Sequence, residues 1–132
     1  MPYTPHPQHR SAAYANAKSQ WSIAIDDEHV CYTLSTLQRW TCGDCYWGLH
    51  VPTQGPAPIP APLGVSPLPN QFPLKIAKFV GDSVGNWHGY PVAHWLSPFD
   101  KPDTPVLRAW LASGYISRPT MAKIHRGKRC NL

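Results

Sequence analysis

Two histidines stand in an aromatic segment, residues 86–95, with the parts needed for acid–base chemistry. His88 and His94 are flanked there by Trp87, Tyr90 and Trp95. A metal-independent ribonuclease needs one imidazole to remove a proton, another to return one, and a cation for the charged phosphate. A small ribonuclease-like toxin that uses His88 and His94 is therefore one alternative function. Because a histidine between aromatic rings is more often structural, a protein without catalytic residues is favoured over an enzyme.

A second group of residues has the chemistry of a zinc ligand set. Cys42 and Cys45 are two residues apart, with Cys31 upstream and His50 downstream. Thiolate and imidazole ligands at such spacing hold tetrahedral zinc. A zinc ribbon needs a second close pair, and the remaining cysteine, Cys130, stands alone near the end of the chain. The sequence therefore leaves two alternatives, a zinc site at the first four residues or free thiols and no cofactor.

Positive charge is concentrated in the last part of the chain. Residues 104–132 contain six cations and no carboxylate, whereas residues 1–103 contain six cations and seven carboxylates. Such a patch suits phosphate groups, an anionic membrane surface or an acidic protein. Nucleic acid, with DNA favoured over RNA, is the partner that we expect. The six cations are Arg108, Arg118, Lys123, Arg126, Lys128 and Arg129.

The string ISRPTMAKIHRG, residues 116–127, resembles the turn and recognition helix of bacterial helix-turn-helix DNA-binding proteins. The resemblance implies that Ser117, Arg118 and Thr120 lie at the N-terminal end of a groove-reading helix, with Met121 and Ile124 as its core anchors. The alternative is a helical hairpin that closes the core and has a solvated basic face. The residues expected to contact nucleic acid are Ser117, Arg118, Thr120, Lys123, Arg126, Lys128 and Arg129.

These residues require a helical hairpin over residues 104–127. Thr104 is the expected N-cap of its first helix, with Pro105 at the first helical position, and Gly114 ends that helix. Ser117 is expected to cap the second helix and Gly127 to end it.

The first half of the chain predicts one helix, at about residues 27–39, because acidic residues begin it and Val30, Leu34 and Leu37 share one face. Asp26 and Asp27 are its expected N-caps. Short strands are expected at residues 21–25, 46–51 and 74–80. Residues 1–20 read as an arm that becomes ordered only against something else. Residues 52–73 hold eight prolines and predict an extended connector, and the segment from 87 to 95 is too irregular to assign.

The length of 132 residues allows one small domain, residues 21–132, preceded by the arm, and excludes a large multidomain enzyme. We therefore predict a small α+β fold. No membrane span or signal peptide is recognisable, which predicts a cytoplasmic protein. The leading hypothesis is a small basic nucleic-acid-binding protein, such as a phage- or plasmid-type regulator. A protein-binding inhibitor, or a subunit of a larger protein or ribonucleoprotein assembly, is the other alternative.

Overall fold

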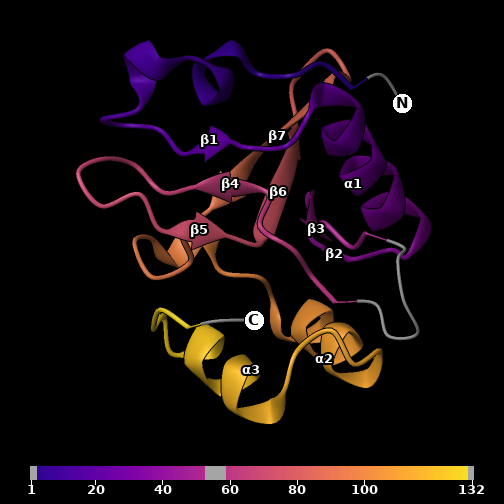
Figure 1. Cartoon of the computed structure of the whole chain (residues 1–132). Coiled ribbons are helices and arrows are strands. Elements are labelled where there is room, and N and C mark those ends of the chain that lie inside the picture. Colours follow the sequence, from indigo (N-terminus) through magenta and orange to yellow (C-terminus); the bar gives the residue numbers. More distant parts are fainter. Residues whose placement is uncertain (1–2, 53–58, 131–132) are drawn as a thin grey trace.

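The computed structural model describes residues 3–52 and 59–130, apart from the side chain of Cys42, and has a mixed α+β fold (Figure 1). A four-stranded antiparallel sheet has the strand order β2 (Thr41–Cys42), β3 (Cys45–Leu49), β6 (Ile76–Gly81) and β7 (Trp87–Val92). A smaller three-stranded sheet has the strand order β1 (Gln20–Trp21), β4 (Gly64–Val65) and β5 (Pro73–Leu74). The helices are α1 (Ile25–Leu37), α2 (Thr104–Ala112) and α3 (Arg118–His125), with short 3-10 turns η1 (Pro7–Arg10), η2 (Ala12–Tyr14) and η3 (Pro98–Asp100).

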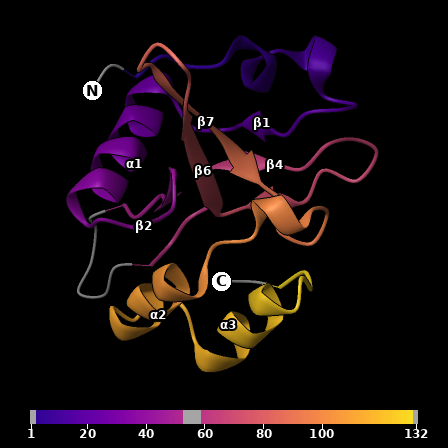
Figure 2. The ribbon, with the colours of Figure 1, turned by 180° about the vertical axis from the view of Figure 1, so that it is seen from behind.

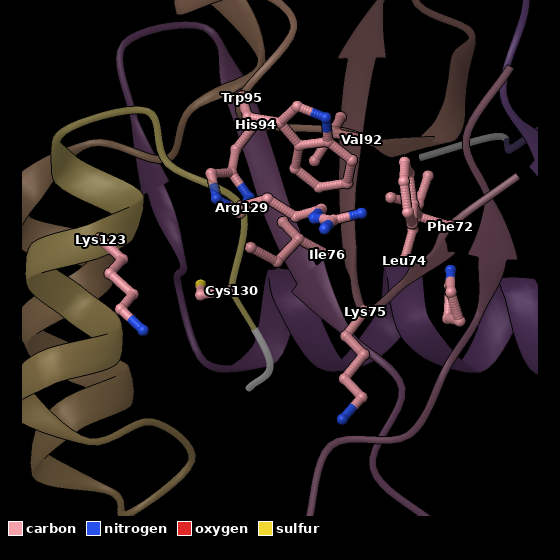
Figure 3. Close-up of a pocket in the computed structure, with 11 residues that line it drawn as sticks. Phe72, Leu74, Lys75, Ile76, Val92, His94, Trp95, Lys123, Arg129 and Cys130 are labelled. Atoms are coloured by element: carbon pink, nitrogen blue, oxygen red, sulfur yellow. The ribbon is translucent and has the colours of Figure 1, made fainter. Parts of the chain in front are cut away.

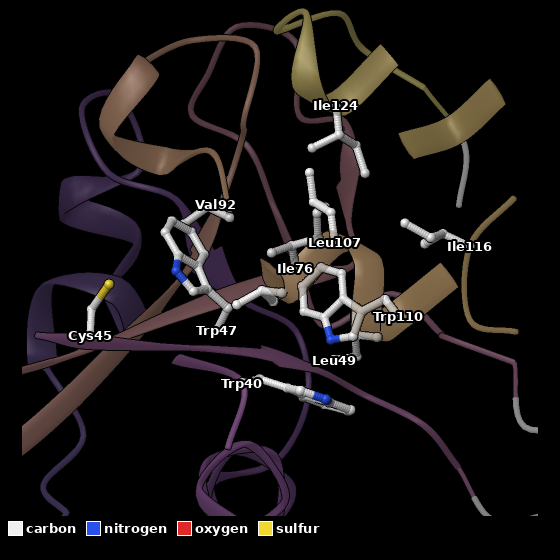
Figure 4. Packing of buried hydrophobic residues seen from close by; sticks show 11 residues of the cluster. Trp40, Cys45, Trp47, Leu49, Ile76, Val92, Leu107, Trp110, Ile116 and Ile124 are labelled. Atoms are coloured by element: carbon white, nitrogen blue, oxygen red, sulfur yellow. The ribbon is translucent and has the colours of Figure 1, made fainter. Parts of the chain in front are cut away.

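The larger sheet separates two hydrophobic clusters, because successive side chains of a strand point to opposite faces. On β3, Trp47 and Leu49 belong to a cluster with the side chains of α2 and α3, whereas Tyr46 packs on the cluster below α1. Trp110 of α2 is fully buried in the first cluster and meets Trp40 edge-on, with ring centroids 5.7 Å apart (Figure 4). Seen from behind, α1 lies along the sheet, and α2 and α3 lie at its far end (Figure 2).

Two glycines make room for Phe79, which is fully buried in the cluster below α1. A Cβ atom placed on Gly89 of β7 would lie 2.2 Å from Phe79 Cδ1, and one on Gly48 of β3 would lie 2.7 Å from Phe79 Cε2. Both glycines are on strands that pair with β6, the strand of Phe79. The aromatic ring therefore occupies the space that two neighbouring side chains would need.

Helix α1 is present where the sequence predicts a helix, but its start and its buried face differ from the expectation. It begins at Ile25, and its N-cap residue is Ala24, which makes no side-chain capping bond. The face turned to the core carries Glu28, Cys31, Tyr32 and Ser35. The expected apolar stripe is wrong at two of its three positions, since Val30 is 61% exposed and Leu37 74% exposed, whereas Leu34 packs against the first cluster. The buried face of α1 thus contains polar side chains and a paired carboxylate. Hydrophobic periodicity alone does not predict such a face.

The N-terminal arm is ordered against its own chain. The Thr4 amide donates to the Trp87 carbonyl at 2.8 Å, so the arm covers β7, the edge strand of the sheet. Tyr3 donates a hydrogen bond to Glu28, and Arg10 pairs with the same carboxylate at 2.7 Å. The arm is thus held by contacts with β7 and α1. It also covers the edge of the sheet at β7, where a strand of another molecule could otherwise pair.

The C-terminal hairpin is formed within the predicted residues 104–127. Ser117 caps α3 as expected, because its Oγ accepts a hydrogen bond from the Thr120 amide at 3.2 Å. The first cap differs by one residue, since Asp103 precedes α2 and Thr104 is its first residue. Gly114 and Gly127 have φ values of 80° and 69°, which favour glycine at a helix end. No helix in the described residues has the length and apolarity that crossing a bilayer requires.

The middle of the chain contains more strand than its prolines suggest. Residues 53–58 of the expected connector lie outside the described part, but Leu63 is fully buried and β4 follows it immediately. Phe72 and Pro73 then lead into β5 and β6. The segment that the sequence leaves unassigned forms β7, which pairs with β6 over six residues.

Candidate functional site

The six cations of the C-terminal segment lie on the surface, and we call these residues, Arg108, Arg118, Lys123, Arg126, Lys128 and Arg129, the cationic surface. All six side chains are exposed. None of them forms an ion pair with another residue in the part of the chain that the structure describes. Three lie on α2 or α3, and the other three follow the end of α3. Their positive charge is therefore available to an external anion.

The two hydroxyl groups expected to contact nucleic acid take part in the start of α3. Ser117 Oγ accepts from the Thr120 amide and also lies 3.0 Å from Thr120 Oγ1, to which it donates. Thr120 is buried, with 9% of its surface exposed. The capping interaction fixes the helix start and leaves Arg118 exposed beside it.

A pocket of about 440 Å³ lies where the cationic surface meets the sheet (Figure 3). We call it the ring pocket, after the aromatic and imidazole rings that line it together with basic residues. Its apolar floor is formed by residues of β5, β6 and β7. The cations come from α3, from the segment that follows α3 and from the residue between β5 and β6. The rings and cations are Phe72, His94, Trp95, Lys75, Lys123 and Arg129.

Two contacts fix the end of the chain beside this pocket. The Arg129 guanidinium lies over the Phe72 ring, 3.8 Å from its centroid, which is a close cation–π contact. His94 Nε2 donates to the Lys128 carbonyl at 2.6 Å. Burial lowers the pKa of His94, although the carbonyl partner opposes this effect. His94 therefore anchors the chain end, a role that its position between aromatic residues did not reveal.

The structure does not bring His88 and His94 into one pocket. His88 is the second residue of β7, and His94 lies two residues beyond the end of this strand. The strand from His88 to Val92 alone spans about 13 Å, since each residue advances about 3.3 Å. That separation is too long for both imidazoles to act on one phosphate group.

His88 instead shares a second pocket of about 440 Å³ with two histidines of the arm. The His6 ring centroid lies 5.3 Å from that of His88 and 5.4 Å from that of His9. Lys18 and Tyr90 also line this space, which we call the histidine pocket. The sequence does not point to His6 and His9, because they lie in the arm, which it predicts to become ordered only against something else. The only sequence feature that could have indicated a shared site for these two histidines is their spacing of three residues.

His9 is held in a defined orientation within the histidine pocket. Its Nδ1 donates to the Ser19 carbonyl at 2.8 Å, and its ring stacks on Tyr90 with centroids 5.0 Å apart. Burial lowers its pKa to about 4, and the hydrogen bond to Ser19 opposes that effect. Burial, and then the neighbouring His88, also lower the pKa of His6. At neutral pH His9 is therefore uncharged, with its second ring nitrogen free of the proton.

The expected zinc ligands are only partly brought together. Cys31 Sγ lies 4.0 Å from His50 Nδ1, and Cys45 is buried. The side chain of Cys42 lies outside what the structure describes. Burial raises the pKa of the Cys31 thiol to about 12, which opposes the thiolate form that zinc binds. Among the described residues, no group of three or more His, Cys, Asp or Glu side chains is arranged to hold a metal ion.

Comparisons with known proteins leave the function to be argued from this geometry. No protein-family model matches the chain, and neither the curated proteins nor the solved structures contain a significant match.

Proposed function

We propose that the protein binds nucleic acid through the cationic surface. The observation that supports this function is the exposure of all six cations, without an ion-pair partner among the described residues, in a segment that has no carboxylate. Nucleic acid presents closely spaced phosphates whose condensed counterions are released when cations replace them. Release of these ions favours binding by any protein surface that keeps its cations exposed and close together.

Salt dependence gives the test of this proposal. If the six cations neutralise about five phosphates of duplex DNA, the logarithm of the association constant falls with the logarithm of salt concentration at a slope of about −4 to −5. The measurement is fluorescence anisotropy of labelled duplex DNA, single-stranded DNA and RNA over a salt series. A slope close to zero on all three polymers would contradict the proposal.

Charge-removing variants locate the binding surface. Replacing Arg118, Lys123 and Arg126 together with Ala should make the slope about two to three units less steep, because each lost phosphate contact removes about one unit. Arg39→Gln is the control, since it removes an exposed cation that follows α1, outside the cationic surface and outside both pockets. The control removes one positive charge and the triple variant three, so a control effect of about one third of the triple variant's effect would show that net charge, and not this surface, governs binding.

A second function, metal-independent cleavage of RNA, is favoured by the histidine pocket. Three imidazoles and an ammonium group line that one pocket. One neutral imidazole would accept the 2′-hydroxyl proton while the 2′-oxygen attacks phosphorus. The bond from phosphorus to the 5′-oxygen then breaks, and an imidazolium gives this oxygen its proton. The products are a 2′,3′-cyclic phosphate and a 5′-hydroxyl group. His6, His9 and His88 are the imidazoles available for these two roles.

Cleavage is tested with RNA and its 2′-deoxy analogue in the presence of a metal chelator. Wild type should cleave only the ribose-containing strand, and His9→Gln and His88→Gln should each remove most of that activity. His125→Gln is the control, because His125 is an exposed histidine on α3, outside the histidine pocket. Cleavage that persists in the double variant would exclude these two residues as acid and base.

A further inference from the structure

We propose that the ring pocket holds one unpaired base of a single-stranded nucleic acid, with the neighbouring phosphates on its cationic rim. This inference rests on the proposed binding function and makes it more specific, because it selects single strands over duplexes. It depends on three properties of the pocket: an indole on which no other described ring stacks, a rim of cations with no Asp or Glu among the described lining residues, and enough space for a base.

The first property is the geometry around Trp95. Phe72 and His94 are its two ring neighbours, and they meet the indole at 77° and 88°, with centroids 6.1 Å and 5.2 Å away. Both arrangements are edge-on, so neither ring lies flat against Trp95. Among the described residues, no other ring is in contact with it. Trp95 is half-buried and lines the pocket (Figure 3), so its indole borders the pocket without another described ring stacked on it.

The second property is the charge of the rim. Lys75, Lys123 and Arg129 come from three separate segments of the chain and converge on the pocket. Among the described residues that line the pocket, none is Asp or Glu. Arg129 already lies on Phe72, so its guanidinium is positioned beside the rings rather than extended into solvent. A base bound between the rings would therefore place its own phosphates among cations.

The third property is space, together with an apolar floor. The volume of about 440 Å³ falls within the range of pockets that bind small molecules. Leu74, Ile76 and Val92 form the floor, and all three are buried. A base in a duplex is covered on both faces by its neighbours and on its edge by its partner. It would have to lose its stacking and its base pair before it could reach this floor. A base in a single strand has no base pair to break, so the energetic cost is lower.

Removing bases while keeping phosphates separates the pocket from the cationic surface. We compare a single-stranded oligothymidylate with an oligonucleotide of the same length in which the central residues are abasic. Stacking of one base on an aromatic side chain corresponds to a change of about 5-fold to 100-fold in Kd. Wild type should lose affinity by this factor on the abasic strand, while the salt slope remains nearly the same.

Two variants assign the effect to the pocket. Trp95→Leu should abolish the discrimination between the two strands, and Trp95→Phe should restore part of it, because a smaller aromatic face is present again. Phe99→Leu is the matched control, since Phe99 is 79% exposed and lies outside the pocket. It should discriminate as wild type does. Thermal unfolding shows whether each variant remains folded.

The outcomes distinguish this inference from the proposed function. Equal affinity of wild type for the two strands, with a steep salt slope, would overturn the base site and leave nucleic-acid binding in place. This comparison needs no variant, so it decides the matter even if Trp95→Leu does not fold. Discrimination that survives in folded Trp95→Leu would place the base elsewhere and would also overturn the inference. Failure of both strands to bind would remove the proposed function and the base site together.

Discussion

Acidification should destabilise the protein through His9, because protonation must occur in a buried position. His9 is 8% exposed and stacks on Tyr90, and burial lowers its pKa from an ordinary value of 6.5 to about 4. After burial, the Ser19 carbonyl favours protonation of His9, whereas His6, Lys18 and His88 disfavour it through repulsion between positive charges. The net effect is that the unfolded chain binds this proton more tightly than the folded chain.

The sign and the size of the effect follow from this difference. Between pH 6.5 and about 4 the unfolded state carries more protons at this site, so the free energy of unfolding falls as the pH falls. Above pH 6.5 the group contributes no pH dependence. The difference between the unfolded and folded pKa values corresponds to a loss of about 3 kcal/mol in the free energy of unfolding once the pH has fallen to the folded value. We reduce this loss to about 2 kcal/mol because the His9 ring borders a pocket open to solvent.

The assay is urea unfolding of wild type and His9→Phe over a series of pH values. Phenylalanine keeps a ring on Tyr90 but cannot be protonated. The carboxylates and the other histidines are present in both proteins, so the difference between the two pH profiles reports on His9. Wild type should lose about 2 kcal/mol more than the variant between about pH 7 and pH 4.5. Parallel pH profiles of the two proteins would refute the reasoning, because they would show that His9 titrates normally when folded.

Three further predictions concern packing, the buried ion pair and thiol reactivity. Gly89→Ala should lower the free energy of unfolding by about 3 kcal/mol or more in urea titration, because its Cβ would lie 2.2 Å from a ring atom of Phe79. Glu28→Gln should cost about 3 to 5 kcal/mol and make the arm susceptible to proteolysis, because the buried partner of Arg10 loses its charge. Cys31 should resist alkylation at mildly alkaline pH until the protein unfolds, since burial raises its thiol pKa to about 12.

Each of these predictions has a control in the same chain. Gly81→Ala places a Cβ 3.1 Å from the Trp87 ring at an exposed strand end and should cost less than about 1 kcal/mol. Asp27→Asn removes an exposed carboxylate next to Glu28 and should leave the arm protected. For Cys31, full alkylation in denaturant shows that the thiol itself is intact. Equal costs for the two glycine variants, early cleavage of Asp27→Asn, or rapid alkylation of the folded protein would contradict the corresponding prediction.

Local signals were sufficient for the fold class and for the C-terminal hairpin. The cap at Ser117 and the glycines that end α2 and α3 act within one or two turns of helix, so the sequence predicts them well. The same local rules misplaced the buried face of α1. Glu28 is buried there because Arg10 and Tyr3, far away in the sequence, reach its carboxylate. No periodicity in the helix itself encodes those partners.

The candidate sites were only partly predictable for the same reason. Exposure of the cationic surface follows from composition, because a run of cations without carboxylates has no local partner. The pairing of His88 with His6 required the arm to cross the edge strand, a contact over more than eighty residues of sequence. The role of His94 likewise depends on a carbonyl that comes 34 residues later. Side-chain types indicated the chemistry, but tertiary contacts decided which residues share a site.

Both pockets are completed by a segment near one end of the chain, and this has a consequence for binding. Residues of the sheet form one wall of each pocket, while the arm closes the histidine pocket, and Arg129 and Cys130 close the ring pocket. His94 joins the ring pocket to the chain that follows α3, because its ring nitrogen holds the Lys128 carbonyl. The cations after α3 are thereby fixed beside the aromatic rings, and less conformational entropy is lost when an anionic strand binds. A base in the ring pocket and phosphates along α3 would then be bound by one preorganised surface.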